Sequence, residues 1–297
     1  MPAFRTLVVD ARVESVMCAY NKVGGDYACE NDWLLNRVLK GDWGYRGWVM
    51  SDWGAVHSTV RAARNGLDQQ SGGELDTHPF FRADLRKAID KGELPRARLD
   101  DMVRRILFGT FAAGLMDAPV VGAPQPIDYA KNAEVAQRAA EAGIVLLKNE
   151  RGILPMATTA RRIVLIGGHA DVGVLSGGGS SQVRSVGGAP VEIPLTGGAA
   201  ASFVRRTWHA SSPLNAIRAL APRAQVDFVD GSDPAVAATA ARGADLAIVV
   251  ATQWTTEAED PEGIALEGNQ DALIAAVAAA NPRTAVVLTT AGPVLMP

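Results

Sequence analysis

The chain has 297 residues, of which 48% are hydrophobic and 21% charged, the composition of a folded globular protein rather than a disordered one. Its 29 Lys and Arg residues nearly balance its 32 Asp and Glu residues, which argues against nucleic-acid binding through a broad basic face. No apolar run approaches the roughly 20 residues that a membrane helix needs. Neither a nucleic acid nor a membrane is therefore expected as a partner.

The first part of the chain alternates short apolar strands with helices. Strands are predicted at residues 15–20 and 48–51, and residues 66–68 indicate the end of a third. A helix is predicted over residues 31–40, and Gly41 ends it. A second helix is predicted to begin directly after Gly54, and two more over residues 79–91 and 96–111. The last of these carries an apolar stripe that is expected to pack in the core, made of Leu99, Met102, Val103, Ile106 and Leu107.

A proline-rich segment interrupts this alternation. Pro119, Pro124 and Pro126 surround Gly122, so residues 117–126 are typical of an extended linker between domains. We therefore expect a first domain over residues 1–117, a linker over 118–127 and a second domain over 128–297.

The second part resumes the alternation of helices and strands. Helices are predicted over residues 128–142, 213–220 and 271–280, and strands over 144–147, 163–166, 225–229, 246–250 and 285–288. The glycine-rich segments 177–181 and 197–201 are typical of loops. Because these strands are continuously apolar, they indicate a mainly parallel sheet with helices on both faces, an α/β fold.

The chain has two cysteines, Cys18 and Cys29, which flank a turn-like segment. They form either a disulfide across this short loop, as an oxidising compartment allows, or two reduced thiols. Two cysteines are too few for a four-ligand zinc site, and none of the four histidines shows metal-ligand spacing, so no metal site is predicted.

The sharpest local feature is Asp52, which follows the apolar strand at 48–51 and precedes Trp53. An ionisable group at the carboxyl end of a parallel strand lies where α/β barrels carry their chemistry. The neighbouring indole is a flat apolar surface that suits a sugar ring. The alternative interpretation is a helix N-cap followed by a core tryptophan.

Several colinear segments resemble the second half of the catalytic barrel of glycoside hydrolase family 3, the family of β-glucosidases and β-xylosidases. They are residues 16–21 (VMCAYN), 34–35 (LL), 43–47 (WGYRG) and 49–54 (VMSDWG). The resemblance continues in order through residues 145–149 (VLLKN), 153–155 (ILP), 177–183 (GGGSSQV), 269–270 (NQ), 273–274 (LI) and 292–294 (GPV). It implies a partial (β/α)8 TIM-like barrel followed by an α/β sandwich domain, both truncated.

The resemblance also implies a retaining, exo-acting β-glycosidase, a β-glucosidase that removes terminal non-reducing β-D-glucosyl residues through a covalent glycosyl-enzyme intermediate. Asp52 is then the nucleophile, because its carboxylate can form an ester with the anomeric carbon. Substrates would be β-linked glucosides or oligosaccharides. This chemistry needs no cofactor.

The partner acid/base of this family comes from the second domain, from a Glu-Gly-x-Asp-Arg segment. Alignment on Asp260, Ile264 and Leu266 implies Glu257 for this role and keeps Glu259 as the alternative. A solvated acidic loop is the competing interpretation. The chain departs from the family pattern at three positions, which are Ala258 for Gly, Pro261 for Arg and Glu267 for Pro.

Five further side chains are implied as substrate-binding residues: Tyr20, Trp53, Ser180, Ser181 and Trp254. Core packing remains the alternative for Tyr20 and Trp254, and loop flexibility remains the alternative for the two serines. The loop at 177–183 is not a phosphate-binding loop, because it lacks the Gly-Lys-Ser/Thr ending.

The length of the first domain raises a second hypothesis. A complete barrel takes about 250 residues, and the residues before the linker allow roughly three βα units. We therefore expect that the N-terminal barrel portion of a parent chain is missing as a partner, and that this chain alone is a non-catalytic fragment. A β-xylosidase of the same family is a further alternative. The resemblance favours a periplasmic or secreted location, and Met1–Asp10 shows no signal peptide.

Overall fold

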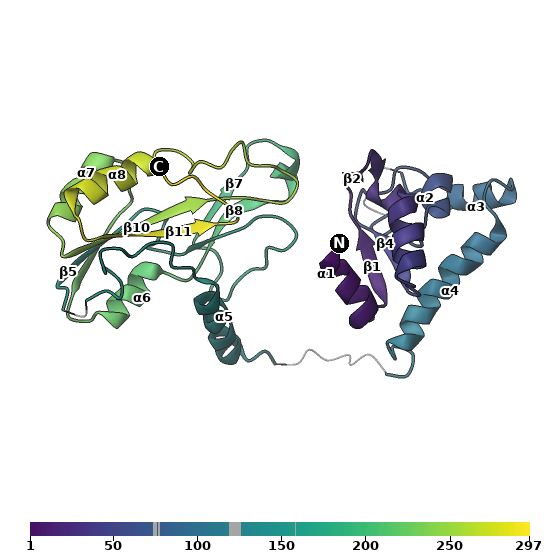
Figure 1. Cartoon of the computed structure of the whole chain (residues 1–297), viewed down its shortest axis with the longest axis horizontal. Helices are drawn as coiled ribbons and strands as arrows, with labels where there is room; N and C mark the ends of the chain where they lie inside the picture. Colours follow the sequence, from purple (N-terminus) through teal and green to yellow (C-terminus); the bar gives the residue numbers. More distant parts are fainter. Residues whose placement is uncertain (74–75, 77, 119–125, 158) are drawn as a thin grey trace. The chain divides into compact units, whose positions relative to one another are not determined.

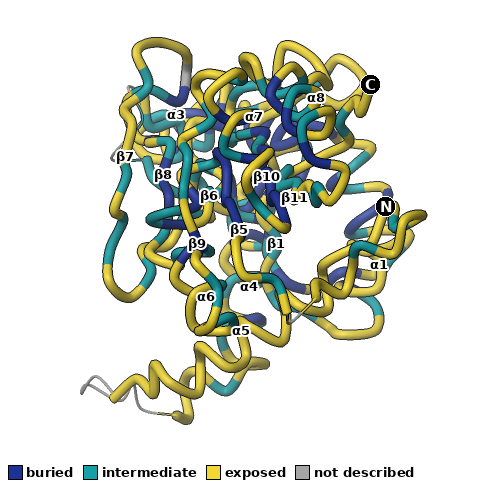
Figure 2. Tube along the Cα trace, turned by 90° about the vertical axis from the view of Figure 1, so that its left-hand side faces the viewer, coloured by how far each residue is buried: buried dark blue, intermediate teal, exposed yellow. Residues whose placement is uncertain are grey.

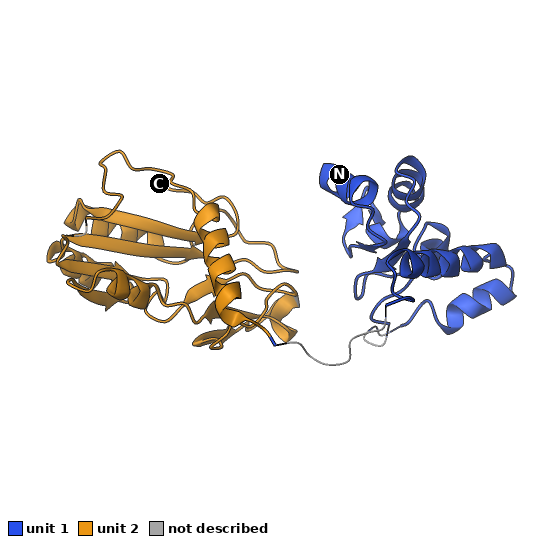
Figure 3. Cartoon of the chain, turned by 90° about the horizontal axis from the view of Figure 1, so that it is seen from below, with its two compact units in different colours: residues 1–126 blue, residues 127–297 orange. Residues whose placement is uncertain are grey.

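A computed structural model describes residues 1–73, 76, 78–118, 126–157 and 159–297. The chain divides into two compact units, residues 1–126 and 127–297 (Figure 3). Residues 119–125, which form most of the predicted linker, lie outside the described residues. The two units are described separately.

Unit 1 contains short strands surrounded by helices (Figure 1). Its elements in chain order are α1 (Pro2–Arg5), η1 (Thr6–Asp10), β1 (Ser15–Cys18), β2 (Lys22–Val23), β3 (Asp26–Tyr27), η2 (Ala28–Glu30), η3 (Trp33–Asp42), β4 (Trp48–Ser51), α2 (Val60–Arg64), α3 (Ala83–Asp90) and α4 (Arg96–Ala112).

Strands β1 and β4 are parallel neighbours, and their register runs from Ser15 opposite Trp48 to Cys18 opposite Ser51. Both were predicted from sequence. The third predicted strand, at 66–68, is reduced to a single parallel bridge between Met50 and Gln69. Among the described residues of unit 1, the parallel sheet thus has two strands, and this alone does not establish a partial barrel.

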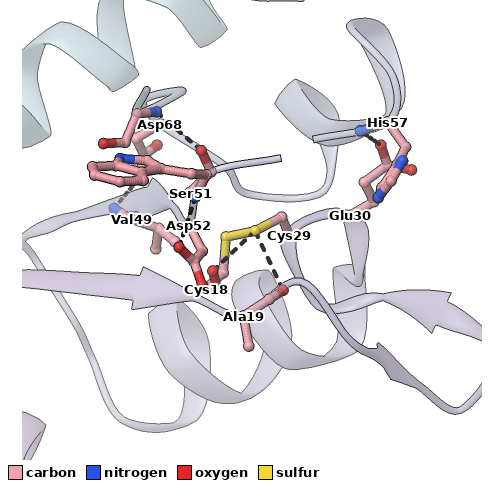
Figure 4. The surroundings of a disulfide bond; sticks show 11 residues. Cys18, Ala19, Cys29, Glu30, Val49, Ser51, Asp52, His57 and Asp68 are labelled. Carbon is pink, nitrogen blue, oxygen red and sulfur yellow. Dashed lines mark hydrogen bonds between the residues drawn. A yellow bond between two sulfur atoms is a disulfide. The ribbon is translucent and has the colours of Figure 1, made fainter. Parts of the chain in front are cut away.

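A disulfide between Cys18 and Cys29 joins the end of β1 to η2 (Figure 4). Both cysteines are buried in one apolar cluster with Leu35 and Leu39 of η3 and Val49 of β4. The bond therefore closes the β2–β3 hairpin at its base, on the core side.

Helix η3 and the segment after Gly54 differ from the prediction. Helix η3 continues through Gly41, because its π-type hydrogen bonds reach five residues on, as from the Trp43 N–H to the Val38 carbonyl. No helix begins after Gly54, because that residue has a φ of +71° and turns the chain. Ala55 and Val56 are then buried within a loop, and α2 begins at Val60.

The apolar stripe on α4 was expected to lie in the core, and this was wrong for two of its five residues. Met102 is buried against α3, whereas Val103 and Leu107 are each 48% exposed. Leu99 packs only partly. The outer side of the stripe forms a shallow apolar groove on the surface of unit 1, together with Phe111. Periodicity identified the helix correctly but could not show how much of its apolar face unit 1 covers.

Helix α3 also begins later than predicted, at Ala83.

A buried ion cluster joins β4 to two helices. The fully buried Asp68 carboxylate accepts hydrogen bonds from Lys40 at 2.8 Å, Arg98 at 2.6 Å and the Val49 N–H at 2.9 Å. Burial lowers the pKa of Lys40 to about 8, although the Asp68 carboxylate opposes that shift. Because every oxygen of Asp68 is paired, the cluster fixes β4 against η3 and α4.

Unit 2 is built on a parallel sheet. Its elements are α5 (Tyr129–Gly143), β5 (Arg162–Ile166), β6 (Val174–Ser176), β7 (Val191–Pro194), η4 (Ala199–Ser202), β8 (Arg205–His209), α6 (Pro213–Leu220), β9 (Gln225–Val229), α7 (Pro234–Arg242), β10 (Leu246–Gln253), α8 (Gln270–Ala280) and β11 (Thr284–Thr290).

Strands β11, β10, β5 and β9 pair in that order, all parallel, which confirms the predicted parallel sheet. Successive residues of the strands face opposite sides. Ile163 and Leu165 pack with Leu214 of α6, whereas Val164 and Ile166 pack on the side of α7 and α8. Figures 1 and 2 show these helices on the two faces of the buried strands. Because both faces of the central strands β5 and β10 are covered, these two strands are largely apolar and buried along their length.

Two parts of unit 2 were not predicted. Strands β6, β8 and β7 form an antiparallel sheet, and their polar and exposed residues break any continuous apolar run. Helix α7 is alanine-rich, but the cap formed by Asp233, which accepts the Ala235 N–H at 2.7 Å, and the following Pro234 were a usable signal. The segment 197–201 is also not wholly a loop, since it enters η4.

The strand predicted at residues 144–147 was wrong. These residues are extended but pair with no strand in the described structure, and their side chains are 63–77% exposed. Helix α5 before them has no buried residue, and it is exposed along its length in Figure 2. An apolar run becomes a strand only where a neighbour supplies hydrogen bonds. No helix in the described ranges is both long and apolar enough to cross a bilayer.

Candidate functional site

Asp52 lies at the carboxyl edge of the β1–β4 pair (Figure 4). Its N–H donates to the Cys18 carbonyl at 3.0 Å, which extends the parallel register by one residue. One carboxylate oxygen accepts the Trp53 N–H at 2.7 Å, and the side chain is half-buried. The Asp52 backbone and one of its carboxylate oxygens are thus held by hydrogen bonds while part of the side chain stays accessible, as a nucleophile requires.

Two aromatic residues follow the same edge. Trp53 comes directly after Asp52 and is 63% exposed, so it is not the core tryptophan of the alternative interpretation. Tyr20 lies two residues beyond β1 and is 41% exposed, so core packing does not account for it either. Because the ends of parallel strands share one edge, both aromatics and Asp52 belong to one surface of unit 1.

In unit 2, the corresponding edge carries Glu257. In the sheet order β9, β5, β10, β11, the chain passes from β5 to β9 on one side and from β10 to β11 on the other, and such a switch point is where open α/β sheets bind ligands. The chain leaves β10 there, and Thr256 pairs with Gly178 of the glycine-rich loop. The Ser180 N–H then donates to Glu257 Oε2 at 2.7 Å.

The glycine-rich loop is built around this carboxylate. A Cβ on Gly179 would lie 2.4 Å from the Cβ of Glu257, and one on Gly178 would lie 2.5 Å from Thr256 Oγ1. Only glycine therefore allows the loop to approach so closely. Ser180 and Ser181 are both exposed beside it.

The two acidic candidates have different surroundings. Glu259 Oε1 accepts the Ala200 N–H at 3.0 Å, and the contact is so close that Gly198 has no room for a side chain. Glu259 thereby fastens the β10 loop to the start of η4. Glu257 instead contacts the glycine-rich loop, so its surroundings favour it over Glu259 as a reacting group.

Ala258 has a φ of +68°, in the left-handed region that favours glycine. This is the position at which the family pattern has glycine when Glu257 is aligned with the family's glutamate. The backbone conformation therefore supports that alignment independently of the acidic residues themselves.

Trp254 is held on several sides. Its indole N–H donates to the Ser176 carbonyl at 3.1 Å, and the Arg206 guanidinium lies 4.9 Å from the ring centroid. Arg206 also pairs with Glu267 at 2.9 Å. Glu267, one of the departures from the family pattern, thus has a defined role in fixing this cation over the ring. Sequence reasoning missed Arg206, because nothing in its local pattern indicates the contact.

The hydrogen bonds from Ser180 also affect the pKa of Glu257. The Ser180 backbone N–H, and then its side chain, hold the pKa of the Glu257 carboxyl below its ordinary value. A general acid needs the opposite shift. Within the described part of the chain, no cluster of three or more His, Cys, Asp or Glu residues could hold a metal ion.

Comparisons with known proteins identify the family. The description "Glycosyl hydrolase family 3 N terminal domain" matches residues 1–108, and "Glycosyl hydrolase family 3 C-terminal domain" matches residues 144–297. The chain belongs to glycoside hydrolase family 3. Family 3 relatives include a probable β-glucosidase L from Aspergillus fumigatus, 34% identical over 97% of this chain, and β-glucosidase cel3A from Pyricularia oryzae, 35% identical over 97%.

Solved family 3 structures have the same α/β fold. A β-D-glucoside glucohydrolase from Trichoderma reesei is 31% identical, with a TM-score of 0.82 over 99% of this chain and 42% of its own. A β-glucosidase from Streptomyces venezuelae, in complex with D-glucose, is 27% identical, with a TM-score of 0.80 over 100% of this chain and 51% of its own. The chain spans about 41% of the length of the Aspergillus relative.

We predict that Ala258→Gly stabilises this family 3 chain by about 0.5–1 kcal/mol, because the relief of left-handed strain exceeds the added entropy of the unfolded chain. Ala265→Gly is the matched control, since Ala265 is exposed in the same loop and is not among the residues with positive φ. It should lower stability instead. Urea unfolding measures both, and a change of the same sign in the two variants would refute the strain argument.

We also predict that Glu257 titrates below the ordinary glutamate pKa of about 4.3, as measured by carboxyl NMR of the whole chain. A depressed carboxyl pKa contributes stability above the unfolded value, and that contribution disappears as pH falls through the folded value. Ser180→Ala should raise the pKa in part, by removing the side-chain hydrogen bond. Ser181→Ala is the control and should leave it unchanged. An unshifted titration in the unmodified chain would contradict the assigned hydrogen bond.

Proposed function

We propose that this chain carries the two reacting carboxylates of a retaining, exo-acting β-glucosidase that removes terminal non-reducing β-D-glucosyl residues. The observation that carries the proposal is Asp52, held by backbone hydrogen bonds at the carboxyl edge of β1 and β4 beside the exposed Trp53. The names of the family 3 relatives support the substrate class.

In the first step, an Asp52 carboxylate oxygen attacks the anomeric carbon of the glucosyl residue. The bond to the leaving oxygen breaks, and that oxygen takes the proton of Glu257. In the second step, Glu257 removes a proton from water, the water oxygen attacks the same carbon, and Asp52 leaves as a carboxylate. Two displacements at one carbon retain the β configuration.

The first step requires a protonated Glu257, although Ser180 favours its ionised form. Retaining glycosidases keep their two carboxyl groups about 5–5.5 Å apart. At that separation, the Asp52 carboxylate would raise the pKa of Glu257 by like-charge repulsion. We propose that the assembled site supplies this repulsion and that unit 2 by itself does not.

The remaining side chains have proposed roles in binding. Trp53 and Tyr20 would hold the terminal sugar, and Ser181 would hydrogen-bond a sugar hydroxyl. Ser180 would position Glu257 through the bond described above. Trp254 would contact the leaving group with the part of its ring that Arg206 leaves free.

We further propose that residues 1–117 correspond to the C-terminal part of a (β/α)8 barrel, 118–127 to a linker and 128–297 to the α/β sandwich domain. The chain would then need the preceding barrel portion as a partner, and alone it would be a non-catalytic fragment. The exposed apolar side of α4 and the 41% coverage of the Aspergillus relative favour this second candidate.

The test compares the chain alone with the chain fused behind the N-terminal portion of the Aspergillus fumigatus relative. We expect the fusion to hydrolyse an aryl β-glucoside faster than the corresponding aryl β-xyloside. We expect the chain alone to hydrolyse the aryl β-glucoside at least about 100-fold more slowly than the fusion does. Faster hydrolysis of the xyloside would favour a β-xylosidase. Equal rates for the chain and the fusion would refute the need for the missing portion.

Variants of the active form then assign the residues. Asp52→Ala should lower kcat at least about 1000-fold, because the glycosyl ester cannot form. Glu257→Ala should retain the first step on substrates with good leaving groups, and added azide should restore turnover by replacing the activated water. Glu259→Ala is the control for the acid. Near-normal activity of Asp52→Ala, or azide rescue of Glu259→Ala alone, would overturn the assignment.

A further inference from the structure

The segment that carries Asp52 and Trp53 rests on a second loop, residues 69–73 and 76. The Ser51 N–H donates to the Gln69 carbonyl at 2.9 Å, and the Ser71 N–H donates to Ser51 Oγ at 3.0 Å. Ser51 is buried, so both bonds lie in the interior. The start of the Asp52 segment is therefore tied to this loop.

Gly72 contacts the Trp53 indole directly. A Cβ at position 72 would lie 2.3 Å from Cδ1 of the ring and 2.9 Å from Nε1. Gly72 also has a φ of +67°. The five-membered edge of the indole therefore lies against bare backbone, while the side chain as a whole is 63% exposed. Any larger residue at position 72 would push the ring toward solvent or turn it.

Asp76 holds the other end of the segment. Its Oδ1 accepts the Gly54 N–H at 3.0 Å, and its Oδ2 accepts a hydrogen bond from the Gln70 side-chain amide. Gln70 in turn accepts the Phe81 N–H at 2.8 Å. A charge-assisted bond thus fixes the backbone directly after Trp53 to the chain that leads into α3.

We propose that Gly72 and Asp76 are positioning residues for the reacting segment: Gly72 fixes the plane of the Trp53 ring, and Asp76 fixes the backbone between Asp52 and Ala55. This inference rests on the proposed glycosidase function. The loop that carries Gly72 and Asp76 would thus orient Trp53, which is proposed to hold the terminal sugar, without itself contacting a reacting atom. A misplacement of about 1 Å in such a segment can cost a factor of ten to a hundred in rate.

The first test records the indole N–H signals of the uniformly ¹⁵N-labelled chain, with Trp53 assigned by Trp53→Phe. Gly72→Ala should shift the Trp53 signal. Gly92→Ala is the matched control, because Gly92 has a φ of +72° but open space around its Cβ position. It introduces the same backbone strain and should leave the Trp53 signal in place. An unmoved signal in Gly72→Ala would refute the role of Gly72.

The second test follows hydrogen exchange at the Gly54 amide, and it remains informative where Gly72→Ala does not fold. Asp76→Ala should speed exchange at least about tenfold, and Asp76→Asn should restore protection, because the amide oxygen still accepts the bond. Asp84→Ala is the control, since Asp84 pairs with His78 and Lys87 outside the segment. Unchanged exchange in Asp76→Ala would refute the role of Asp76.

Activity separates this inference from the function on which it rests. In the form that hydrolyses aryl β-glucosides, Gly72→Ala and Asp76→Ala should lower kcat/KM about tenfold, with recovery in Asp76→Asn. If Asp52→Ala stays active, the proposed function fails, even where the Trp53 signal moves. If Asp52→Ala is inactive and the two loop variants have normal kcat/KM, the function stands and the positioning role is wrong.

Discussion

Parallel strand pairing is the constraint on which both candidate sites depend. Because parallel strands run in one direction, their carboxyl ends meet at one edge, and the loops that follow them are brought together however distant they are in sequence. In unit 1 this pairing joins the end of β1 to the end of β4 and ties the Asp52 backbone to Cys18. In unit 2 it sets the ends of β5 and β10 side by side, at the point where the connections after the two strands run to opposite sides of the sheet.

Each edge is completed by contacts that only glycine allows. Gly72 gives room to the Trp53 ring, and Gly179 gives room to Glu257. These close approaches fix an aromatic surface and a carboxylate without covering them, which is the requirement of a site that must bind a sugar and react with it. The hydrogen bonds from Ser180 hold the pKa of Glu257 below its ordinary value, and a general acid needs the opposite shift.

Sequence patterns predicted those strands in which successive residues are all buried. The strands at 163–166 and 246–250 are buried on both faces, and their apolar runs gave them correctly. The edge strand at 225–229 was also predicted correctly, although Gln225 and Asp227 within it are exposed. The run at 144–147 is equally apolar but pairs with no strand among the residues that the structure describes, so the same rule failed. Asp52 could be singled out, because it follows such a strand. Gly72 and Asp76 could not, because their roles arise from contacts with Trp53 and Gly54 that no local pattern encodes.

We propose above all that the Asp52 carboxylate forms the covalent bond to the sugar. The test treats the active form with a fluorinated aryl β-glucoside whose sugar, once bound to the enzyme, is released only slowly. Peptide mass spectrometry then locates the trapped sugar. We expect a glycosyl ester on Asp52 and no such label when the Asp52→Ala variant is treated in the same way. A label on any other residue, or turnover with no labelled peptide, would contradict it.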